Sequence, residues 1–334
     1  MKAFIVERYG DADAVRTSEM PEPQVGEDDV LVQIHAASVN PLDLKTRDGD
    51  FKAILPYRVP FVLGNDLAGV VVGVGARVSR FTVGNEVYAR PDKYRIGTFA
   101  ERIAVADADL ALKPTSISMA EAGSLPLVAL TAWQALVERG NVQPGQKVLI
   151  HAGAGGVGSI AIQLAKHLGA TVATTASRSN ADFVREFGAD TVIDYRTHDF
   201  EQILSGYDLV LDSLGGENLE KSLRVLKPRG QAIGIAGPPD PAFAREAGSN
   251  PVLRLAIAGL SGKIRRQANR LGVRYEFLFV RVSGDQLRQI TTLVDHGVLR
   301  PVVGKIFGFD QTPQALQSLS KGGIRGKAVI TGNN

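Results

Sequence analysis

Cysteine is absent from this chain of 334 residues. Without a thiol the protein can form no disulfide, no thiolate zinc site and no cysteine nucleophile. Long apolar runs are absent too. Residues 67–78 come nearest, but they are broken by glycine and fall short of the ~18 apolar residues that a membrane helix needs. Glu7 and Arg8 interrupt the N-terminal apolar stretch, so we expect no signal peptide. These absences predict a cytoplasmic protein with no membrane partner.

An excess of charge of one sign is also missing. The 38 Lys and Arg residues against 35 Asp and Glu give a net charge of +3. A nucleic-acid-binding surface needs clustered Lys and Arg, and the densest basic run, residues 262–274, is short enough to be a solvated helix face. We therefore expect no nucleic-acid partner. The 44% hydrophobic and 22% charged content is that of an ordinary globular protein.

The chain is divided into two parts by its pattern of apolar residues. The first ~120 residues carry short β-like runs separated by Pro, Gly and Asp, which favour an antiparallel barrel or sandwich. Beyond them, apolar runs at 147–152, 170–176, 191–195, 207–213, 230–236 and 275–280 alternate with helical periodicity. That alternation predicts an α/β fold with a doubly wound parallel sheet. We expect a β-rich domain at 1–121 and 284–334, and a dinucleotide-binding domain at 122–283.

A glycine-rich loop follows the first strand of the predicted sheet. Gly153, Gly155 and Gly158 form a G-x-G-x-x-G pattern, and the apolar residues from Val157 to Leu168 then recur on one helical face. In this context the glycines allow a tight turn, close approach of a pyrophosphate and close packing of helix on strand. The alternative is a tight turn with no ligand. The residues predicted to hold the pyrophosphate are Gly153, Gly155, Gly156, Val157 and Gly158.

The end of the second strand indicates which dinucleotide is bound. An NAD site expects an acidic residue about 20 positions past the loop, yet no acid stands between Ser159 and Ala181. Ser177 and Arg178 stand there instead, and a guanidinium and a hydroxyl suit a 2′-phosphate. This favours NADPH as the cofactor. The alternative is that Arg178 is a solvated loop residue.

Other dehydrogenase chemistries leave no trace in the sequence. No tyrosine is followed four positions later by lysine, which excludes the Tyr-x-x-x-Lys pair of short-chain enzymes. The five histidines are scattered without metal-ligand spacing, and each is interpreted as a surface or locally bonded residue. We therefore predict a hydride cofactor site and no metal.

The arrangement resembles the medium-chain dehydrogenase/reductase superfamily, which has a GroES-like β-rich domain and a Rossmann domain. Metal-dependent members carry Gly-His-Glu where this chain has Gly64, Asn65 and Asp66, in VLGNDLAGVVVGVG, and a cysteine where it has Asn40. The structural-zinc lobe is also missing. These departures, with GTFAERIAV, AGSLPLVALTAWQAL and VLDSLGG, resemble the zinc-independent quinone oxidoreductase and enone oxidoreductase branch.

The resemblance implies roles for individual residues. Cofactor contacts are implied for Thr131, Ser177, Arg178, Tyr195, Ser213, Gly215, Phe279 and Arg281. A catalytic or substrate-side role is implied for Asn40, Asp43 and Lys45, although Asp43 and Lys45 could instead form a surface ion pair. Phe51 and Tyr57 are either an apolar wall of the site or part of the core. The family also implies a homodimer paired through an edge strand at 275–280.

The function implied is hydride transfer from NADPH to a quinone or to the activated C=C of an α,β-unsaturated carbonyl. Without zinc, hydrogen-bond donors must stabilise the negative charge that develops on the substrate oxygen. Asn40, Lys45 and a ribose hydroxyl of the cofactor are the candidate donors, and no residue stands out as the general acid. The alternatives are a polyketide-type enoyl reductase and a non-catalytic NADPH-binding protein.

Overall fold

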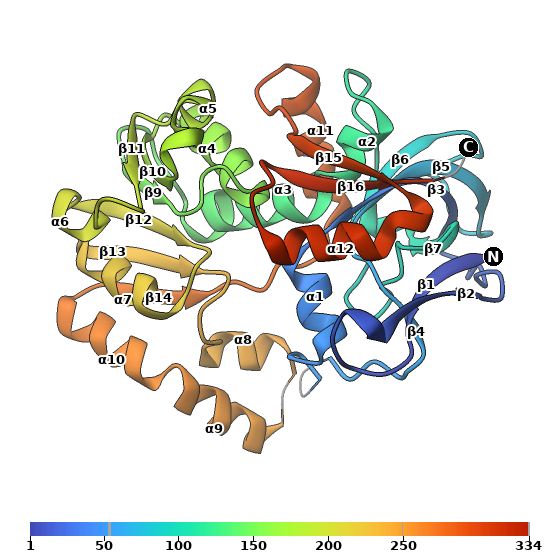
Figure 1. The fold of residues 1–334 in the computed structure, drawn as a ribbon, viewed down its shortest axis with the longest axis horizontal. Coiled ribbons are helices and arrows are strands. Elements are labelled where there is room, and N and C mark those ends of the chain that lie inside the picture. Colours follow the sequence, from blue (N-terminus) through green and yellow to red (C-terminus); the bar gives the residue numbers. More distant parts are fainter. Residues whose placement is uncertain (53–54, 249, 333–334) are drawn as a thin grey trace. The chain divides into compact units, whose positions relative to one another are not determined.

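The computed structural model describes residues 1–52, 55–248 and 250–332 (Figure 1). The chain forms two compact units. The first combines residues 1–130 with residues 281–334, and the second comprises residues 131–280. No helix within the described ranges is long and apolar enough to cross a membrane.

The first unit is built on β-sheets. Seven strands form one sheet in the order β15-β16-β3-β5-β6-β8, with β7 also pairing with β3, and all of these pairs are antiparallel except β15 with β16. A smaller antiparallel sheet has the order β2-β1-β4. The strands are β1 (Lys2–Val6), β2 (Val15–Glu19), β3 (Asp29–Val39), β4 (Phe61–Val62), β5 (Leu67–Val74), β6 (Glu86–Ala89), β7 (Arg102–Ala106), β8 (Leu110–Leu112), β15 (Val303–Gly308) and β16 (Lys327–Thr331). The predicted antiparallel architecture is confirmed.

Alternation along β3 explains the core of this unit. Val30, Val32 and Ile34 point to one face and are buried, and they pack with Leu67, Val87 and other apolar side chains. The helices of the unit are α1 (Pro41–Asp48), α2 (Met119–Gly123), α3 (Pro126–Trp133), which runs on into the second unit, α11 (Gly284–Asp295) and α12 (Thr312–Lys321).

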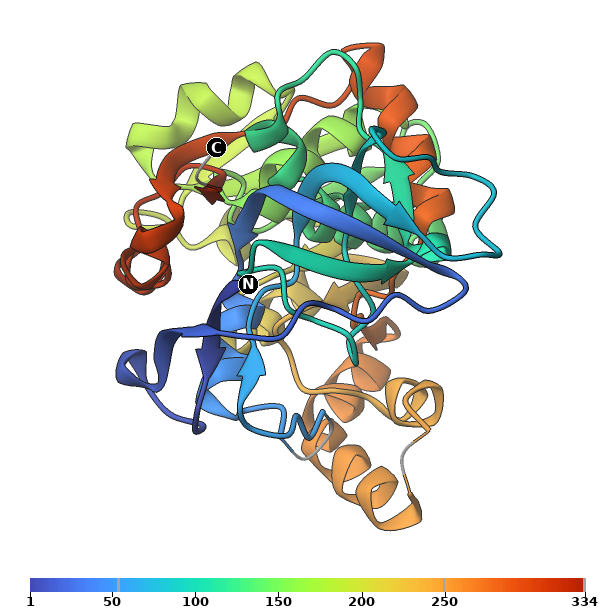
Figure 2. The same cartoon turned by 90° about the vertical axis from the view of Figure 1, so that its right-hand side faces the viewer.

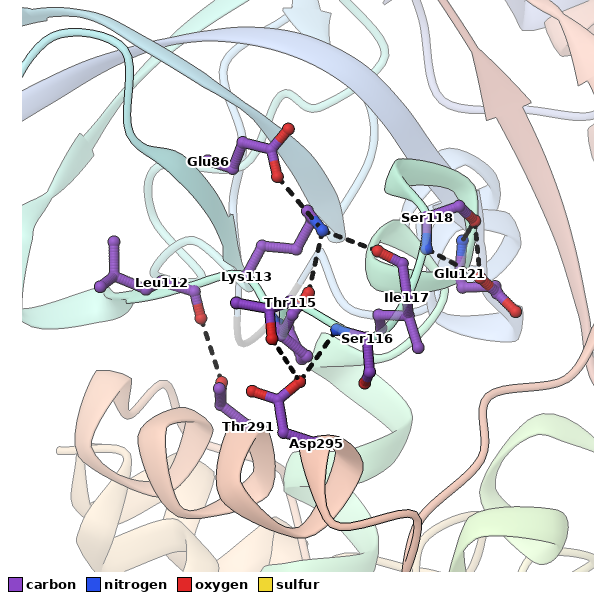
Figure 3. Close-up of polar contacts among 11 residues, drawn as sticks. Glu86, Leu112, Lys113, Thr115, Ser116, Ile117, Ser118, Glu121, Thr291 and Asp295 are labelled. Carbon is purple, nitrogen blue, oxygen red and sulfur yellow. Dashed lines mark hydrogen bonds and ion pairs between the residues drawn. The ribbon is translucent and has the colours of Figure 1, made fainter.

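Polar contacts fasten the returning C-terminal segment to the β-rich unit. Asp295, the last residue of α11, accepts hydrogen bonds from the Ser116 N–H at 3.0 Å and the Thr115 hydroxyl at 3.3 Å (Figure 3). Thr291, one turn earlier, donates to the Leu112 carbonyl at 3.1 Å. Residues 281–334 are therefore part of the first unit in space, although residues 131–280 separate them from it in sequence.

The second unit contains a six-stranded parallel sheet in the order β11-β10-β9-β12-β13-β14. This is the strand order of a doubly wound nucleotide-binding sheet, with its switch point between β9 and β12. The strands are β9 (Lys147–Ile150), β10 (Thr171–Ala176), β11 (Thr191–Asp194), β12 (Tyr207–Asp212), β13 (Leu226–Gly234) and β14 (Arg274–Phe277). The predicted Rossmann sheet is confirmed, and the sixth strand ends three residues before the predicted limit, Val280.

Helices connect these strands, as a parallel sheet requires. Figure 2 shows the strands of the first unit, in blue and cyan, from a second direction. The helices are α4 (Gly156–His167), α5 (Ala181–Glu186), α6 (Phe200–Ile203), α7 (Gly216–Arg224), α8 (Pro241–Glu246), α9 (Pro251–Leu260) and α10 (Gly262–Leu271). The apolar face predicted after the glycine loop is observed, since Ile160, Ala161, Leu164 and Ala165 of α4 are all buried.

Candidate active site

The glycine-rich loop connects β9 to the N-terminus of α4. Gly155 is the N-cap residue of α4, and it offers no side chain to the first N–H groups of the helix. Those groups have no partner within a helix and attract anions. Gly156, Val157 and Gly158 form the first turn of α4. The loop therefore presents backbone donors where the sequence predicted a pyrophosphate.

The three glycines of the motif are small for different reasons. A Cβ on Gly153 would lie 2.2 Å from the Thr174 hydroxyl oxygen, and one on Gly158 would lie 2.3 Å from the Ala152 carbonyl oxygen. A Cβ on Gly155 would meet its nearest neighbour, the same carbonyl, only at 3.3 Å. Internal packing therefore requires glycine at positions 153 and 158 and much less so at 155. The free space at Gly155, beside the N-terminus of α4, forms a cradle in which a pyrophosphate can approach the backbone closely.

A cavity of about 270 Å³ lies beyond the end of β10. Ser177 and Arg178 line it, and Arg178 is exposed with no ion pair to another described residue. Arg185, which was not among the sequence candidates, also lines it, as does Asp194 at the end of β11, and Arg185 forms an ion pair with Asp182 at 2.9 Å. Tyr195 is exposed beside it, and the Arg196 guanidinium lies 5.8 Å from the centre of its ring. The guanidinium groups of Arg178 and Arg185, which both line this cavity, suit a phosphate.

The loop after β12 lies beside the glycine loop. Ser213 donates to the His151 carbonyl at 3.4 Å, and the Gly215 N–H donates to Asp212 Oδ1 at 2.7 Å. Gly215 has a φ of 68°, which favours glycine. Ser213 and Gly215 are therefore close to the glycine-rich loop, and their contacts with a cofactor stay a prediction.

A buried histidine ties these two loops together. His151 Nε2 lies 2.9 Å from the Ser222 hydroxyl, which donates to Asp212 Oδ2 at 3.2 Å, and His151 Nδ1 lies 3.1 Å from the Thr175 hydroxyl. Burial lowers the pKa of His151, so the ring is neutral near pH 7. From the sequence, His151 is interpreted as a surface or locally bonded residue. Its real partners could not be foreseen, because Thr175 and Ser222 are remote from it in sequence.

The remaining cofactor candidates lie close in sequence to the points where one unit ends and the other begins, after Leu130 and after Val280. Thr131 is buried on α3. Phe279 packs on Phe243 with ring centres 5.7 Å apart. Arg281 is the first residue of the segment that returns to the first unit. Their contacts with a cofactor stay a prediction.

On the substrate side, Asp43 is completely buried. It is the third residue of α1, and its carboxylate accepts the Asn40 N–H at 2.6 Å and the Asn65 side-chain amide at 2.7 Å. Burial raises the pKa of Asp43 to about 7, against the opposing effects of these hydrogen bonds and of Lys327. The alternative interpretation, in which Asp43 and Lys45 form a surface ion pair, is therefore wrong. Asp43 is buried, whereas Lys45 lies on the exposed side of α1.

The Asn40 side chain is held on three sides. Its Nδ2 donates to Asp66 Oδ2 at 2.8 Å and to the Ser38 carbonyl at 3.2 Å, and its Oδ1 accepts from Lys327 Nζ. A lysine only donates and a carboxylate only accepts, so these partners determine the orientation of the amide. Both N–H groups of the amide are used. In this arrangement Asn40 has no donor left to offer a substrate oxygen.

Lys327 is the functional candidate that sequence analysis missed. It is buried at the start of β16, with its Nζ 3.5 Å from Asp66 Oδ2. Asp66 also accepts the Ser38 hydroxyl at 2.7 Å and the Leu127 N–H at 2.6 Å. A lysine opening the last apolar run was the only signal in the sequence. Among the residues that the structure describes, no group of three or more His, Cys, Asp or Glu could hold a metal ion.

Tyr57 belongs to an aromatic cluster of the first unit. The ring centre of Tyr57 lies 5.0 Å from that of Phe61, and the ring centre of Phe61 lies 5.9 Å from that of Tyr9. The Tyr57 hydroxyl donates to the Lys93 carbonyl at 2.5 Å. Tyr57 and Phe51 are both half-buried. Neither is enclosed in the core, so a role as an apolar wall stays a prediction.

Comparison with known proteins agrees with this geometry. Residues 26–115 match the alcohol dehydrogenase GroES-like domain family, and residues 187–330 match the zinc-binding dehydrogenase family. The chain is 34% identical over 354 residues to the mitochondrial NAD(P)H oxidoreductase RTN4IP1 of Danio rerio, with 99% of this chain and 91% of the relative covered. It is 35% identical over 341 residues to the chloroplastic NADPH-dependent alkenal/one oxidoreductase of Arabidopsis thaliana, covering 99% and 79%.

A solved structure shows the same fold over the full length. The quinone oxidoreductase from Coxiella burnetii superposes with a TM-score of 0.87 and 31% identity, and 99% of each chain is covered. A nucleotide-binding sheet joined to a GroES-like unit defines a class of dinucleotide-dependent oxidoreductases. The chain belongs to the medium-chain dehydrogenase/reductase superfamily, in the branch of quinone oxidoreductases and alkenal/one oxidoreductases.

Proposed function

We propose that the protein is an NADPH-dependent reductase of quinones or of the activated C=C bond of α,β-unsaturated carbonyls, and that it works without a metal. The observation that carries the proposal is the open cradle at Gly155. It lies at the N-terminus of α4, in the same unit as the cavity lined by Arg178 and Arg185. When bound, NADPH supplies a hydride. The N-terminus of α4 binds its pyrophosphate and the two arginines its 2′-phosphate.

The choice of NADPH over NADH rests on charge. Between Ser159 and Ala181 the chain has no carboxylate that could bond a ribose 2′-OH, and Arg178 has no ion-pair partner among the described residues. Asp194 does line the cavity, but it lies at the end of β11, the strand next to β10, where it pairs with Ala176, whereas the usual ribose carboxylate lies at the end of β10 itself. Substitution of Arg178 by alanine tests this preference.

The choice of an activated C=C over an isolated ketone also follows from electrostatics. Reduction of a ketone places a full charge on one oxygen, and a metal would be the strong means of stabilising it. Lys327 lies buried against Asn40, one of the positions where the resemblance places a metal ligand, and against Asp66, which follows the other such position, Asn65. A conjugated acceptor spreads the charge, so that a few hydrogen bonds suffice.

The test is a screen for NADPH oxidation with quinones, alkenals, cyclic enones and enoyl thioesters, followed by identification of the product by NMR and mass spectrometry. A saturated ketone formed from an enone is the expected product. An allylic alcohol as the main product would contradict the proposal. NADPH binding with no turnover of any acceptor would favour a non-catalytic NADPH-binding protein, and selective turnover of enoyl thioesters would favour a polyketide-type enoyl reductase.

A further inference from the structure

Arg90 follows β6 and has the largest fully buried side chain among the described residues. Ala89 pairs with Leu67 across β6 and β5, so Arg90, which follows β6, lies near Asp66, which precedes β5. Only 1% of Arg90 is exposed. The guanidinium is thus inside the same unit, close to the network that holds Asn40.

The donors of this guanidinium are left unused. Nη1 makes one long hydrogen bond, 3.4 Å to the Pro91 carbonyl, while Nε and Nη2 have no partner in the described ranges. Leaving charged donors buried and unpaired is costly, and such groups call for an explanation. Arg95, in the same unit, shows the usual solution, because it forms two 2.7 Å bonds to the Asp29 carboxylate.

The surrounding charges restrict what ligand Arg90 can take. Burial lowers the pKa of Arg90, and the nearby carboxylates of Asp66, Asp92 and Asp109 oppose that shift. Carboxylates therefore already lie near the guanidinium, although none of them is bonded to its donors. A phosphate or carboxylate would be repelled by these acids. A neutral oxygen that gains negative charge only during a reaction suits the site better.

We propose that the Nε–H and Nη2–H of Arg90 are the hydrogen-bond donors that receive the substrate's carbonyl oxygen in the proposed reduction. This inference rests on the proposed function, which needs a donor to a developing enolate. Asn40 has no free N–H, and Lys45 is exposed. Nε and Nη2 lie side by side on the planar group, so both can bond one oxygen. Both atoms are buried, so the inference requires that neighbouring side chains move when the substrate enters.

The bonding changes balance as follows. The β-carbon of the enone accepts a hydride from NADPH, which is oxidised to NADP⁺. The former C=C electrons form a new double bond between the α-carbon and the carbonyl carbon, and the carbonyl π electrons move onto oxygen as an enolate. Arg90 donates to that oxygen throughout. The α-carbon then takes a proton from water, the C=O bond reforms, and a saturated ketone is released.

The test compares Arg90→Met and Arg90→Lys with the wild type, using NADPH and an enone that the wild type reduces. Loss of one oxyanion donor typically lowers kcat by about 100- to 1000-fold, and we expect a loss of that size for Arg90→Met with the Kd for NADPH unchanged. The melting temperature should stay the same or rise, because an unpaired buried charge is removed. Arg90→Lys should be intermediate in kcat.

Chemical rescue supplies a second readout. Added guanidinium should restore part of the kcat of Arg90→Ala, whereas urea, which has the same shape and no charge, should not. Arg95→Gln is the matched control: it breaks the Asp29 pair and should lower the melting temperature while leaving kcat unchanged. Arg90→Met with wild-type kcat would overturn the inference, as would a loss of kcat that accompanies a lower melting temperature and is not rescued by guanidinium. A wild type that reduces no enone or quinone would instead contradict the proposed function itself.

Discussion

Arg178 forms no ion pair with the other described residues, so no role in stabilising its own unit is visible. It is exposed and lines the cavity beyond β10. A charge-assisted hydrogen bond contributes about 1.5–3 kcal/mol. Arg178→Ala should therefore weaken NADPH binding by roughly 10- to 100-fold and leave NADH binding nearly unchanged, as measured by titration calorimetry. Arg266→Ala, which removes an exposed arginine of α10 that does not line the cavity, is the control. Equal losses for both cofactors would show that Arg178 is structural.

Asp43 predicts how stability depends on pH. Its pKa is about 7 in the folded protein, well above the usual unfolded value of about 3.9. Between these values the folded state holds a proton that the unfolded state has lost. The stabilisation is full below about pH 4 and is lost as the pH rises through about 7, with a slope of at most ~1.4 kcal/mol per pH unit.

Urea unfolding across this pH range measures the effect. Asp43→Asn keeps a side chain of the same shape and cannot titrate, so its stability should lack the downward slope. Asp50→Asn, at an exposed position shortly after α1, is the matched control and should keep it. Parallel pH profiles for the wild type and Asp43→Asn would mean that Asp43 is ionised throughout.

At the scale of elements, the loop between β9 and α4 contains glycines with two different roles: packing requires Gly158, whereas Gly155 leaves space for a ligand. Gly158→Ala places a Cβ against the Ala152 backbone carbonyl at 2.3 Å, and such overpacking typically costs about 1–3 kcal/mol. Gly155→Ala needs only a small shift. We expect Gly155→Ala to keep nearly the wild-type melting temperature and yet to weaken both NADPH and NADH by about tenfold or more. Unchanged binding in a stable Gly155→Ala protein would remove this loop from the site.

The sequence predicts elements whose signals are local. The parallel sheet, the glycine loop and the buried face of α4 all follow from periodicity and from glycine spacing within a few dozen residues. The network around Asn40 could not be predicted this way, because Lys327 is 287 residues from it. Nor does any pattern show that the N–H groups of Asn40 are already used or that those of Arg90 are not. Hydrogen-bond satisfaction depends on contacts between strands that are distant in sequence.

Across the whole first unit, charge balance depends on β16. Lys327→Met leaves the Asp66 carboxylate buried without its nearby ammonium, and breaking a buried pair in this way typically costs about 3–5 kcal/mol. Denaturant unfolding should show a loss of that size, and adding Asp66→Asn should recover part of it. Lys321→Met, at an exposed position near the end of α12, should change little. A Lys327→Met protein as stable as the wild type would mean that Lys327 and Asp66 are not coupled.

The complete protein is also predicted to need no metal. Cysteine is absent, and Asn40 and Asn65 stand where the resemblance places metal ligands. Elemental analysis of the purified protein should find zinc well below one ion per chain, and a chelator should leave NADPH-dependent turnover unchanged. Stoichiometric zinc together with chelator-sensitive activity would contradict the prediction.

The position of Lys327 has a consequence for the order of events on the ribosome. Residues 131–280 are synthesised without interruption and form the second unit, so that unit can fold as soon as it has emerged. The first unit cannot be completed then, because β3 still lacks its neighbour β16 and Asp66 still lacks Lys327. During synthesis residues 36–39 of β3 therefore lack their partner strand and Asp66 lacks its countercharge, so the nascent first unit is the part more exposed to mispairing and aggregation.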